Sequence, residues 1–82
     1  MIAPRLTPIE QTLLQALVNG VGVVPYTDLL TAAWGSPEAM SVEVLRVHIC
    51  RLRQRLMRAG QFAIHNHRDQ GYSLGMKERH SS

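Results

Sequence analysis

The sequence is poor in several residue types, and each shortage excludes a class of protein. Its 82 residues include one cysteine, Cys50, so no internal disulfide can form and the fold must rest on packing, as suits a reducing cytosol. No apolar run approaches the ~20 residues that a bilayer span requires. Residues 1–6 lack a charged region followed by an apolar stretch, so nothing indicates a signal peptide. We expect a cytoplasmic protein without a membrane partner.

Groupings of residues that carry out catalysis are also missing. The sequence shows no paired carboxylates, no nucleophile with a neighbouring base and no glycine-rich phosphate loop. Two pairs, His48 with Cys50 and His65 with His67, could suggest a metal site, but neither pair has the spacing typical of zinc ligands. We therefore expect no enzyme activity, no metal site and no cofactor.

The chain does hold enough apolar residues for one compact domain. Hydrophobic residues make up 45% of the sequence, which argues against intrinsic disorder. A chain of this length buries only about 60% of the surface that its unfolded form exposes, so we expect modest stability. The predicted domain spans residues 1–75, and residues 76–82 are predicted to form a disordered tail.

Positive charge is concentrated in one segment. Residues 1–43 hold one arginine and four acidic residues, whereas residues 44–68 hold six arginines and no acidic residue. A block of arginines beside an acidic remainder is typical of a surface that binds a polyanion. The same charges would also fit a solvated helix face, so charge alone leaves both interpretations open.

A helix is predicted near the N-terminus. Thr7-Pro8-x-Glu10 has the form of a helix start, because Thr7 can cap the free N–H groups and Glu10 can complete a capping box. Asn19-Gly20 predicts the end of this helix, with the glycine in a left-handed conformation. The apolar residues 21–24 fit either a short strand or a buried connector, which Pro25 ends.

Two further helices are expected. The second runs from about Tyr26 to Trp34, with Trp34 in the core, and the third runs from its N-cap Ser41 to about Ala59. At 100° per residue, the third helix has one apolar stripe that faces the core, while its other sides are polar and cationic. The stripe comprises Leu45, Ile49, Leu52 and Leu56; the opposite side comprises Glu43, Val47, Arg51, Gln54 and Arg58; one flank holds Arg46, Cys50 and Arg53, and the other holds His48 and Arg55.

A β-hairpin is predicted after the third helix, which Gly60 closes. Residues 61–65 and 72–74 have the pattern of strands, and residues 66–71 that of the turn between them. Tyr72 is expected to pack back on the third helix. A hairpin directly after a basic helix has the shape of a wing. The expected fold is therefore mainly α with a small β-hairpin wing, a three-helix winged helix-turn-helix.

The order of these elements resembles the C-terminal effector domain of OmpR/PhoB-type response regulators. The resemblance covers roughly residues 6–75, and it is most specific where a Val-His-Ile-x-Arg-Leu-Arg run lies between the first helix and a Gly-Tyr hairpin. The motifs that match are Leu6-Thr7-Pro8-x-Glu10 with Leu13-Leu14, Leu29-Leu30, Trp34-Gly35, Val47-His48-Ile49-x-Arg51-Leu52-Arg53 and Gly71-Tyr72.

This resemblance implies a regulator of transcription that binds double-stranded DNA, encoded by a bacterium or a phage and associated with the nucleoid. The third helix would enter the major groove, with Val47 and Arg51 toward the bases and His48 and Arg53 on the backbone, and the hairpin would place Arg68 at the minor groove. We expect a monomer in free solution and head-to-tail pairs on tandem sites. The candidate DNA-binding residues are Arg46, Val47, His48, Cys50, Arg51, Arg53, Gln54, Arg55, Arg58 and Arg68.

The chain also departs from the pattern of the family, and this leaves a second function open. There is no room for a receiver domain, and residues 1–5 stand where the family has a four-stranded sheet, so phosphorylation control is not implied. Cys50 stands at a position where the family often has arginine. Asp69 stands at a position of the wing where the family often has glycine. The alternative function is a protein-interaction module that binds RNA polymerase or a full-length response regulator. The resemblance implies that a polymerase contact would lie in the loop between the second and third helices, residues 35–40. Duplex RNA fits less well, because its major groove is too narrow for a helix.

Overall fold

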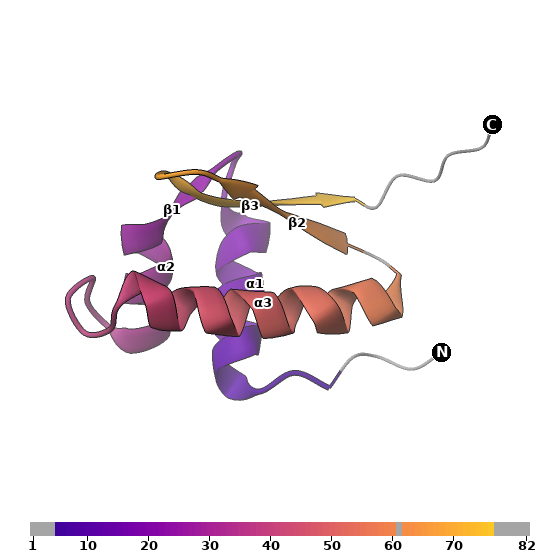
Figure 1. Cartoon of the computed structure of the whole chain (residues 1–82), viewed down its shortest axis with the longest axis horizontal. Helices are drawn as coiled ribbons and strands as arrows, with labels where there is room; N and C mark the ends of the chain where they lie inside the picture. The colour runs from indigo at the N-terminus through magenta and orange to yellow at the C-terminus, as the bar shows by residue number, and fades with distance from the viewer. Residues whose placement is uncertain (1–4, 61, 77–82) are drawn as a thin grey trace.

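The computed structural model describes residues 5–60 and 62–76 and contains three helices and a small sheet (Figure 1). This architecture confirms the expected class, a mainly helical domain with a β wing. The elements follow in the order α1 (Pro8–Asn19), β1 (Val24–Pro25), α2 (Tyr26–Trp34), α3 (Val42–Ala59), β2 (Phe62–His67) and β3 (Gly71–Met76).

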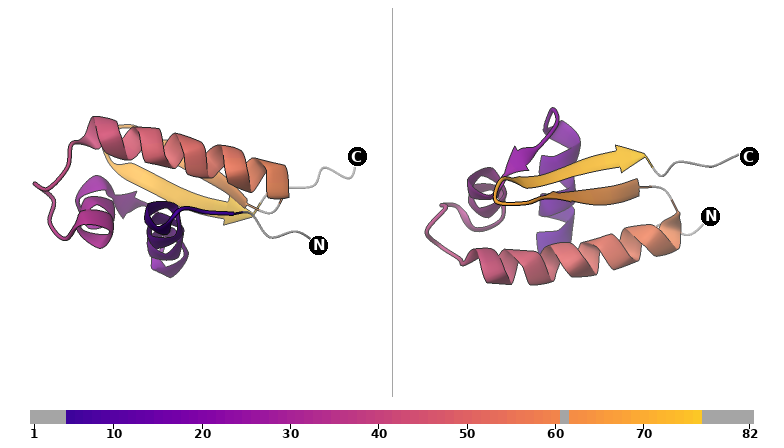
Figure 2. Two further views of the ribbon diagram at one scale, coloured as in Figure 1. Left: turned by 90° about the horizontal axis from the view of Figure 1, so that it is seen from below. Right: turned by 45° about the horizontal axis from the view of Figure 1, so that its top comes forward.

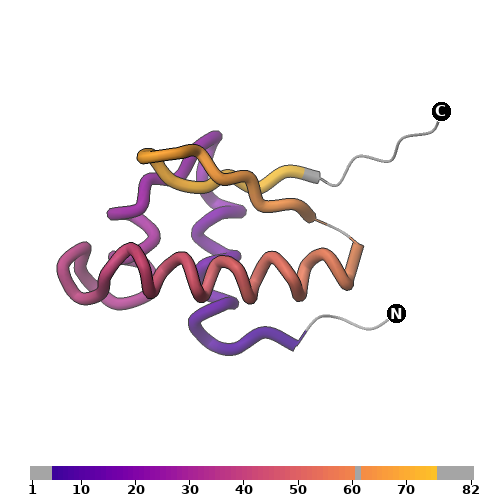
Figure 3. The backbone as a smooth tube through the Cα atoms, viewed as in Figure 1, coloured from indigo at the N-terminus to yellow at the C-terminus, as the bar shows by residue number. Residues whose placement is uncertain are grey.

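The long helix α3 crosses α1, and the hairpin of β2 and β3 lies along α3 (Figures 1 and 2). After α3 the chain reverses, so that β2 runs back along the helix and β3 then returns (Figure 3). The short strand β1, which directly precedes α2, pairs with β3 from the side of α1 and α2. The hairpin is thereby attached both to the helix before it and to the pair of helices at the start of the chain.

Local capping explains where the helices begin and end. The Thr7 hydroxyl accepts a hydrogen bond from the Glu10 backbone N–H at 3.2 Å, and the Thr7 backbone N–H donates to the Glu10 carboxylate at 3.0 Å. This is the predicted capping box. The Ser41 hydroxyl likewise caps α3 by accepting from the Val44 N–H at 3.2 Å, and Gly60 ends α3 in the left-handed conformation with φ of 71°.

Gly20, which follows α1, corrects one expectation. Its φ of −78° is in the extended region, so it is not the left-handed cap that the sequence predicted. The reason for a glycine here is the close approach of a neighbour, since a Cβ atom would overlap the Cγ2 atom of Val24. Gly20 therefore allows β1 to pack against the end of α1.

The sheet has the strand order β1-β3-β2, and its strands differ in extent from the prediction. The segment that the sequence left undecided, residues 21–24, leads into a strand of two residues, Val24–Pro25, so Pro25 belongs to the strand and does not end it. An edge strand tolerates proline because it need not donate a hydrogen bond on its outer side. The hairpin strands are longer than expected, since Asn66 and His67 belong to β2 and the turn is confined to residues 68–70. Met76 ends β3 instead of opening a tail, and residues 77–82 and Gln61 lie outside the described residues.

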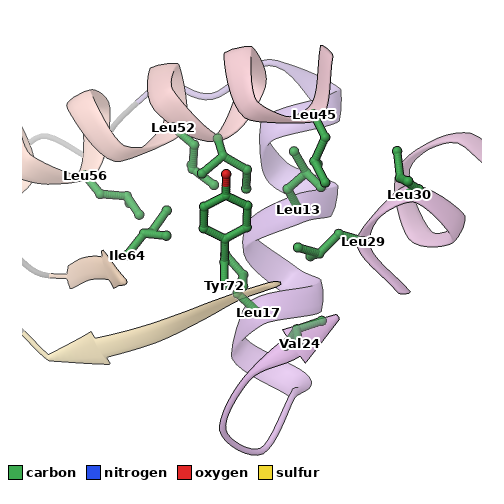
Figure 4. Packing of buried hydrophobic residues seen from close by; sticks show 11 residues of the cluster. Leu13, Leu17, Val24, Leu29, Leu30, Leu45, Leu52, Leu56, Ile64 and Tyr72 are labelled. Atoms are coloured by element: carbon green, nitrogen blue, oxygen red, sulfur yellow. The ribbon is translucent and has the colours of Figure 1, made fainter. Parts of the chain in front are cut away.

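The core lies between α3, α1, α2 and the hairpin (Figure 4). All four members of the predicted α3 stripe are buried, which confirms the orientation of this helix. Tyr72 is 4% exposed and directs its hydroxyl toward α3, as expected, while Trp34 packs against the core in a half-buried position. The buried apolar residues are Leu13, Leu17, Val24, Leu29, Leu30, Leu45, Ile49, Leu52, Leu56, Ile64 and Tyr72.

Candidate nucleic-acid interface

The outer side of α3 is free of contacts with the core. Because the apolar stripe faces inward, the residues half a turn away must face solvent. Val47 is 47% exposed, so an aliphatic side chain lies in the middle of this polar surface. The structure brings together five exposed residues on this side, as predicted: Glu43, Val47, Arg51, Gln54 and Arg58.

One flank of α3 faces the wing, and a groove of about 420 Å³ lies between them. Arg46, Cys50 and Arg53 border it from the helix, while Asn66 and Arg68 border it from the hairpin. Four candidate DNA-binding residues, separated by up to 22 positions in sequence, thus meet in one place. The sequence indicated that three of them share a flank but not that this flank faces Arg68.

The floor of this groove includes the buried ring of Tyr72. Burial raises the pKa of the Tyr72 hydroxyl above its usual value, and the neighbouring Tyr26, whose ring centroid lies 5.7 Å away, adds to the rise. The positive charges of Arg46 and Arg53 oppose it. The charges of both guanidinium groups therefore lower the pKa of the hydroxyl at the floor of the groove, against the larger effect of burial.

The tip of the wing places Arg68 in solvent. The turn closes through a hydrogen bond from the Gln70 N–H to the His67 carbonyl at 2.9 Å, and the Tyr26 N–H donates to the Gln70 carbonyl at 3.2 Å. Asp69 has φ of 61°, a left-handed conformation in which aspartate is tolerated better than most residues. This accounts for the aspartate at the wing position where the resembling family often has glycine.

The other flank of α3 faces α1 and contains an ion pair that the sequence did not predict. Glu10 is only 1% exposed, and its Oε1 atom lies 3.0 Å from Nε of Arg55, although the N–H direction does not meet hydrogen-bond geometry. Arg55 also donates from Nη1 to the Arg5 carbonyl at 3.2 Å. Its guanidinium is thus engaged within the fold, whereas Arg51 and Arg58 on the outer side of α3 are exposed and make no ion pair among the described residues. The capping-box pattern indicated Glu10, but only for its local role.

Loss of this ion pair should destabilise the domain. Arg55→Ala leaves the buried Glu10 carboxylate without its cation, so we expect a loss of about 1–3 kcal/mol in the free energy of unfolding. The value stays below that of a fully buried pair because the Arg55 side chain is 42% exposed. Denaturant titration should show this loss for Arg55→Ala but not for the exposed control Arg58→Ala. Equal stability of the two variants would mean that the ion pair contributes nothing.

His48, His65, His67 and Cys50 were considered above as metal ligands. His67 instead makes a hydrogen bond of 2.7 Å with the Ser73 hydroxyl, and the ring of His48 lies 5.4 Å from that of Trp34. Cys50 is exposed as a free thiol. Across residues 5–60 and 62–76, histidine, cysteine, aspartate and glutamate form no cluster of three that could hold a metal ion. No helix in that same part of the chain is long and apolar enough to cross a membrane.

Comparison with known proteins agrees with the fold. The family model described as "Transcriptional regulatory protein, C terminal" matches residues 3–74. No curated protein and no solved structure matches the chain. The family is one of DNA-binding effector domains and not of enzymes. The chain is therefore a member of the family of OmpR/PhoB-type C-terminal effector domains, which bind DNA in the regulation of transcription.

Proposed function

We propose that this domain reads a specific sequence of double-stranded DNA by placing α3 in the major groove and the wing against the adjacent minor groove. The observation that supports this most is the combination of faces on α3. One side is fixed to the core by four buried residues, and the opposite side presents an exposed valine between arginines. A major groove accommodates one α-helix, whose outward side chains then meet the edges of the bases.

Two residues of the outer side have the chemistry to select bases. Val47 can contact the methyl group of thymine, which is the one apolar feature that a base offers in the major groove. The guanidinium of Arg51 can donate two parallel hydrogen bonds to O6 and N7 of guanine. Gln54, three residues after Arg51 on the same exposed side, can bind adenine in the same two-point manner.

The remaining candidate residues have positions suited to the DNA backbone. Arg46, Arg53 and Arg58 would neutralise phosphates, His48 would donate a hydrogen bond to one, and Arg68 would lie at the minor groove. We assign Arg55 to the support of α3 through Glu10 and not to DNA. We further propose that the domain is monomeric in solution and binds tandem sites as head-to-tail pairs.

Selection from a random pool of duplexes, followed by variants of two arginines, tests this function. The wild-type domain should enrich a common motif. Arg51→Ala should then weaken binding to the selected site by about 1–3 kcal/mol and change binding to random duplex much less, because it removes a contact with a base. Arg68→Ala should weaken both to a similar extent. Equal losses for both variants on both duplexes would contradict the assignment of Arg51 to base recognition.

Failure to enrich any motif would contradict sequence-specific binding. The residues between α2 and α3, at positions 35–40, of which all but Ser36 and Met40 are exposed, would then be the surface to vary. In that case binding to RNA polymerase or to a full-length response regulator would take the place of duplex DNA as the proposed function.

A further inference from the structure

One residue on the outer side of α3 has a charge that opposes binding to DNA. Glu43 is exposed on this side, and α3 contains five arginines but no other acidic residue. A carboxylate close to the phosphates of a duplex is repelled by them, which lowers the affinity for DNA of every sequence. The position of Glu43 therefore indicates a specific role in the complex, unless the helix itself requires an acidic residue there.

The helix accounts for only part of this observation. Glu43 lies in the first turn of α3, where a negative charge interacts favourably with the helix dipole. That interaction is the same in the free and the bound protein, and it gives no preference among bases. Asp28 is likewise exposed in the first turn of α2. Asp28 therefore serves as the reference for a residue whose role is confined to the helix dipole.

The carboxylate of Glu43 is available to a partner outside the fold. Glu10, by contrast, completes a capping box and pairs with Arg55. Arg46 follows Glu43 by three residues, a spacing at which side chains on a helix can meet. The two nevertheless form no ion pair in the part of the chain that the structure describes. The Glu43 oxygens can therefore accept hydrogen bonds from a bound molecule.

The spacing along α3 places Glu43 in the same row as the residues proposed to contact bases. Glu43, Val47 and Arg51 follow one another at intervals of four residues, which corresponds to about 6 Å along the helix axis. Base pairs are stacked about 3.4 Å apart, so neighbouring members of the row would meet bases about two pairs apart. The N-terminal residues of a recognition helix are those that contact base edges. Glu43 would therefore lie beyond the Val47 contact, on the side away from Arg51.

We propose that Glu43 is a specificity-determining residue that selects cytosine by accepting a hydrogen bond from its N4 amino group. Cytosine presents this donor in the major groove, whereas guanine presents the acceptors O6 and N7 and thymine the acceptor O4. An acceptor facing a carboxylate has no proton to share and is repelled. Adenine has an amino group, but its N7 acceptor lies beside that group. The inference rests on the proposed function and names one further base that α3 selects.

A carboxylate at this position increases selectivity more than affinity. It weakens binding to most sequences and offsets that loss where cytosine supplies a donor, so the selected and the random duplex differ more in affinity. The selected site should contain a thymine opposite Val47, a guanine toward Arg51, and a cytosine about two base pairs from the thymine on the other side.

Selection from a random pool of duplexes with three variants tests this assignment. Val47→Ala should lose the preference for thymine and thereby marks the reference position. Glu43→Gln should enrich the wild-type motif with adenine in place of cytosine, because a carboxamide pairs with N6 and N7 of adenine. In titrations, the wild-type domain should bind the cytosine duplex about tenfold more tightly than the adenine duplex, and Glu43→Gln should reverse this order.

Asp28→Asn is the matched control. It removes the same charge from an exposed residue in the first turn of a helix, and Asp28 lines a hollow between α1 and α2 rather than the outer side of α3. This variant should enrich the wild-type motif unchanged. Thermal melts should show that both charge variants are folded. An identical motif for Glu43→Gln and the wild type would overturn the proposal, and so would an equal gain in affinity for selected and random duplexes, which indicates repulsion alone.

Failure of this inference can be told apart from failure of the proposed function. If the wild-type domain enriches a motif without cytosine at the expected position, Glu43 does not select this base, while sequence-specific binding of DNA stands. If no motif is enriched from the pool, the proposed function fails, and the role of Glu43 fails with it.

Discussion

Replacing Leu52 with alanine should remove about 2–5 kcal/mol from the free energy of unfolding. Leu52 is 0% exposed and lies in the middle of the α3 stripe, where it faces the hairpin and α1 (Figure 4). Its removal leaves a cavity that the surrounding side chains fill only in part. A domain this small has little stability in reserve, so much of Leu52→Ala should be unfolded at 37 °C.

Denaturant and thermal unfolding followed by circular dichroism measure this effect. Met57→Ala is the matched control, because Met57 is a large apolar residue of the same helix that is 58% exposed. Its substitution should change the free energy of unfolding by no more than about 0.5 kcal/mol. A melting temperature for Leu52→Ala equal to that of Met57→Ala would mean that the faces of α3 are assigned wrongly.

Replacing Gly71 with alanine should have the second largest effect, about 2–4 kcal/mol. A Cβ atom at this position would overlap the carbonyl oxygen of Val24 and would lie 2.9 Å from Cα of Pro25. Both neighbours are backbone atoms of β1, so no side chain can rotate away. The pairing of β1 with β3 would have to open, and the hairpin would lose its attachment to α2. We therefore expect weaker DNA binding together with lower stability.

Gly75→Ala in the same strand is the control for this substitution. A Cβ atom there would meet the far end of the exposed His65 side chain, at 2.9 Å from Nε2, and this side chain can shift. We expect a change of no more than about 1 kcal/mol. Equal unfolding midpoints for the two variants would contradict a structural role for the contact between β1 and the base of the wing.

The boundaries of the helices could be predicted because their determinants are local. Thr7 with Glu10, Ser41, and Gly60 each act on backbone groups within four residues, so the sequence around them is sufficient. The orientation of α3 was equally accessible, because the spacing of its four leucine and isoleucine residues sets the buried side. The outer side of α3, and with it most of the candidate interface, follows from the same spacing.

Features that depend on contacts between separate elements could not be predicted in this way. Gly20 is needed for contact with Val24, a neighbour brought close by the turn between α1 and β1, and its conformation therefore differs from that of a local cap. The partner of Glu10 is Arg55, 45 positions further along the sequence. The strand at Val24 and Pro25 exists because β3 lies beside it. Periodicity reports which side of an element is buried, but it does not identify the neighbour.

The groove between α3 and the wing belongs to this second group. The sequence placed Arg46, Cys50 and Arg53 on one flank and Arg68 on the hairpin, but no local pattern states which flank the hairpin covers. Packing of Tyr72 under α3 decides this, since its buried ring holds β3 against the helix. The convergence of these four residues on one groove could therefore be found from the structure and not from the sequence alone.

The salt dependence of binding to duplex DNA tests the central claim most directly. Fluorescence anisotropy with a random 20-base-pair duplex, a length chosen as roughly two helical turns, should be measured from about 50 to 200 mM salt. If Arg46, Arg53, Arg58 and Arg68 each neutralise a phosphate, log K should fall linearly with log salt, with a slope of about −3 to −4. No binding at the lowest salt, or an affinity that hardly changes with salt, would contradict the account.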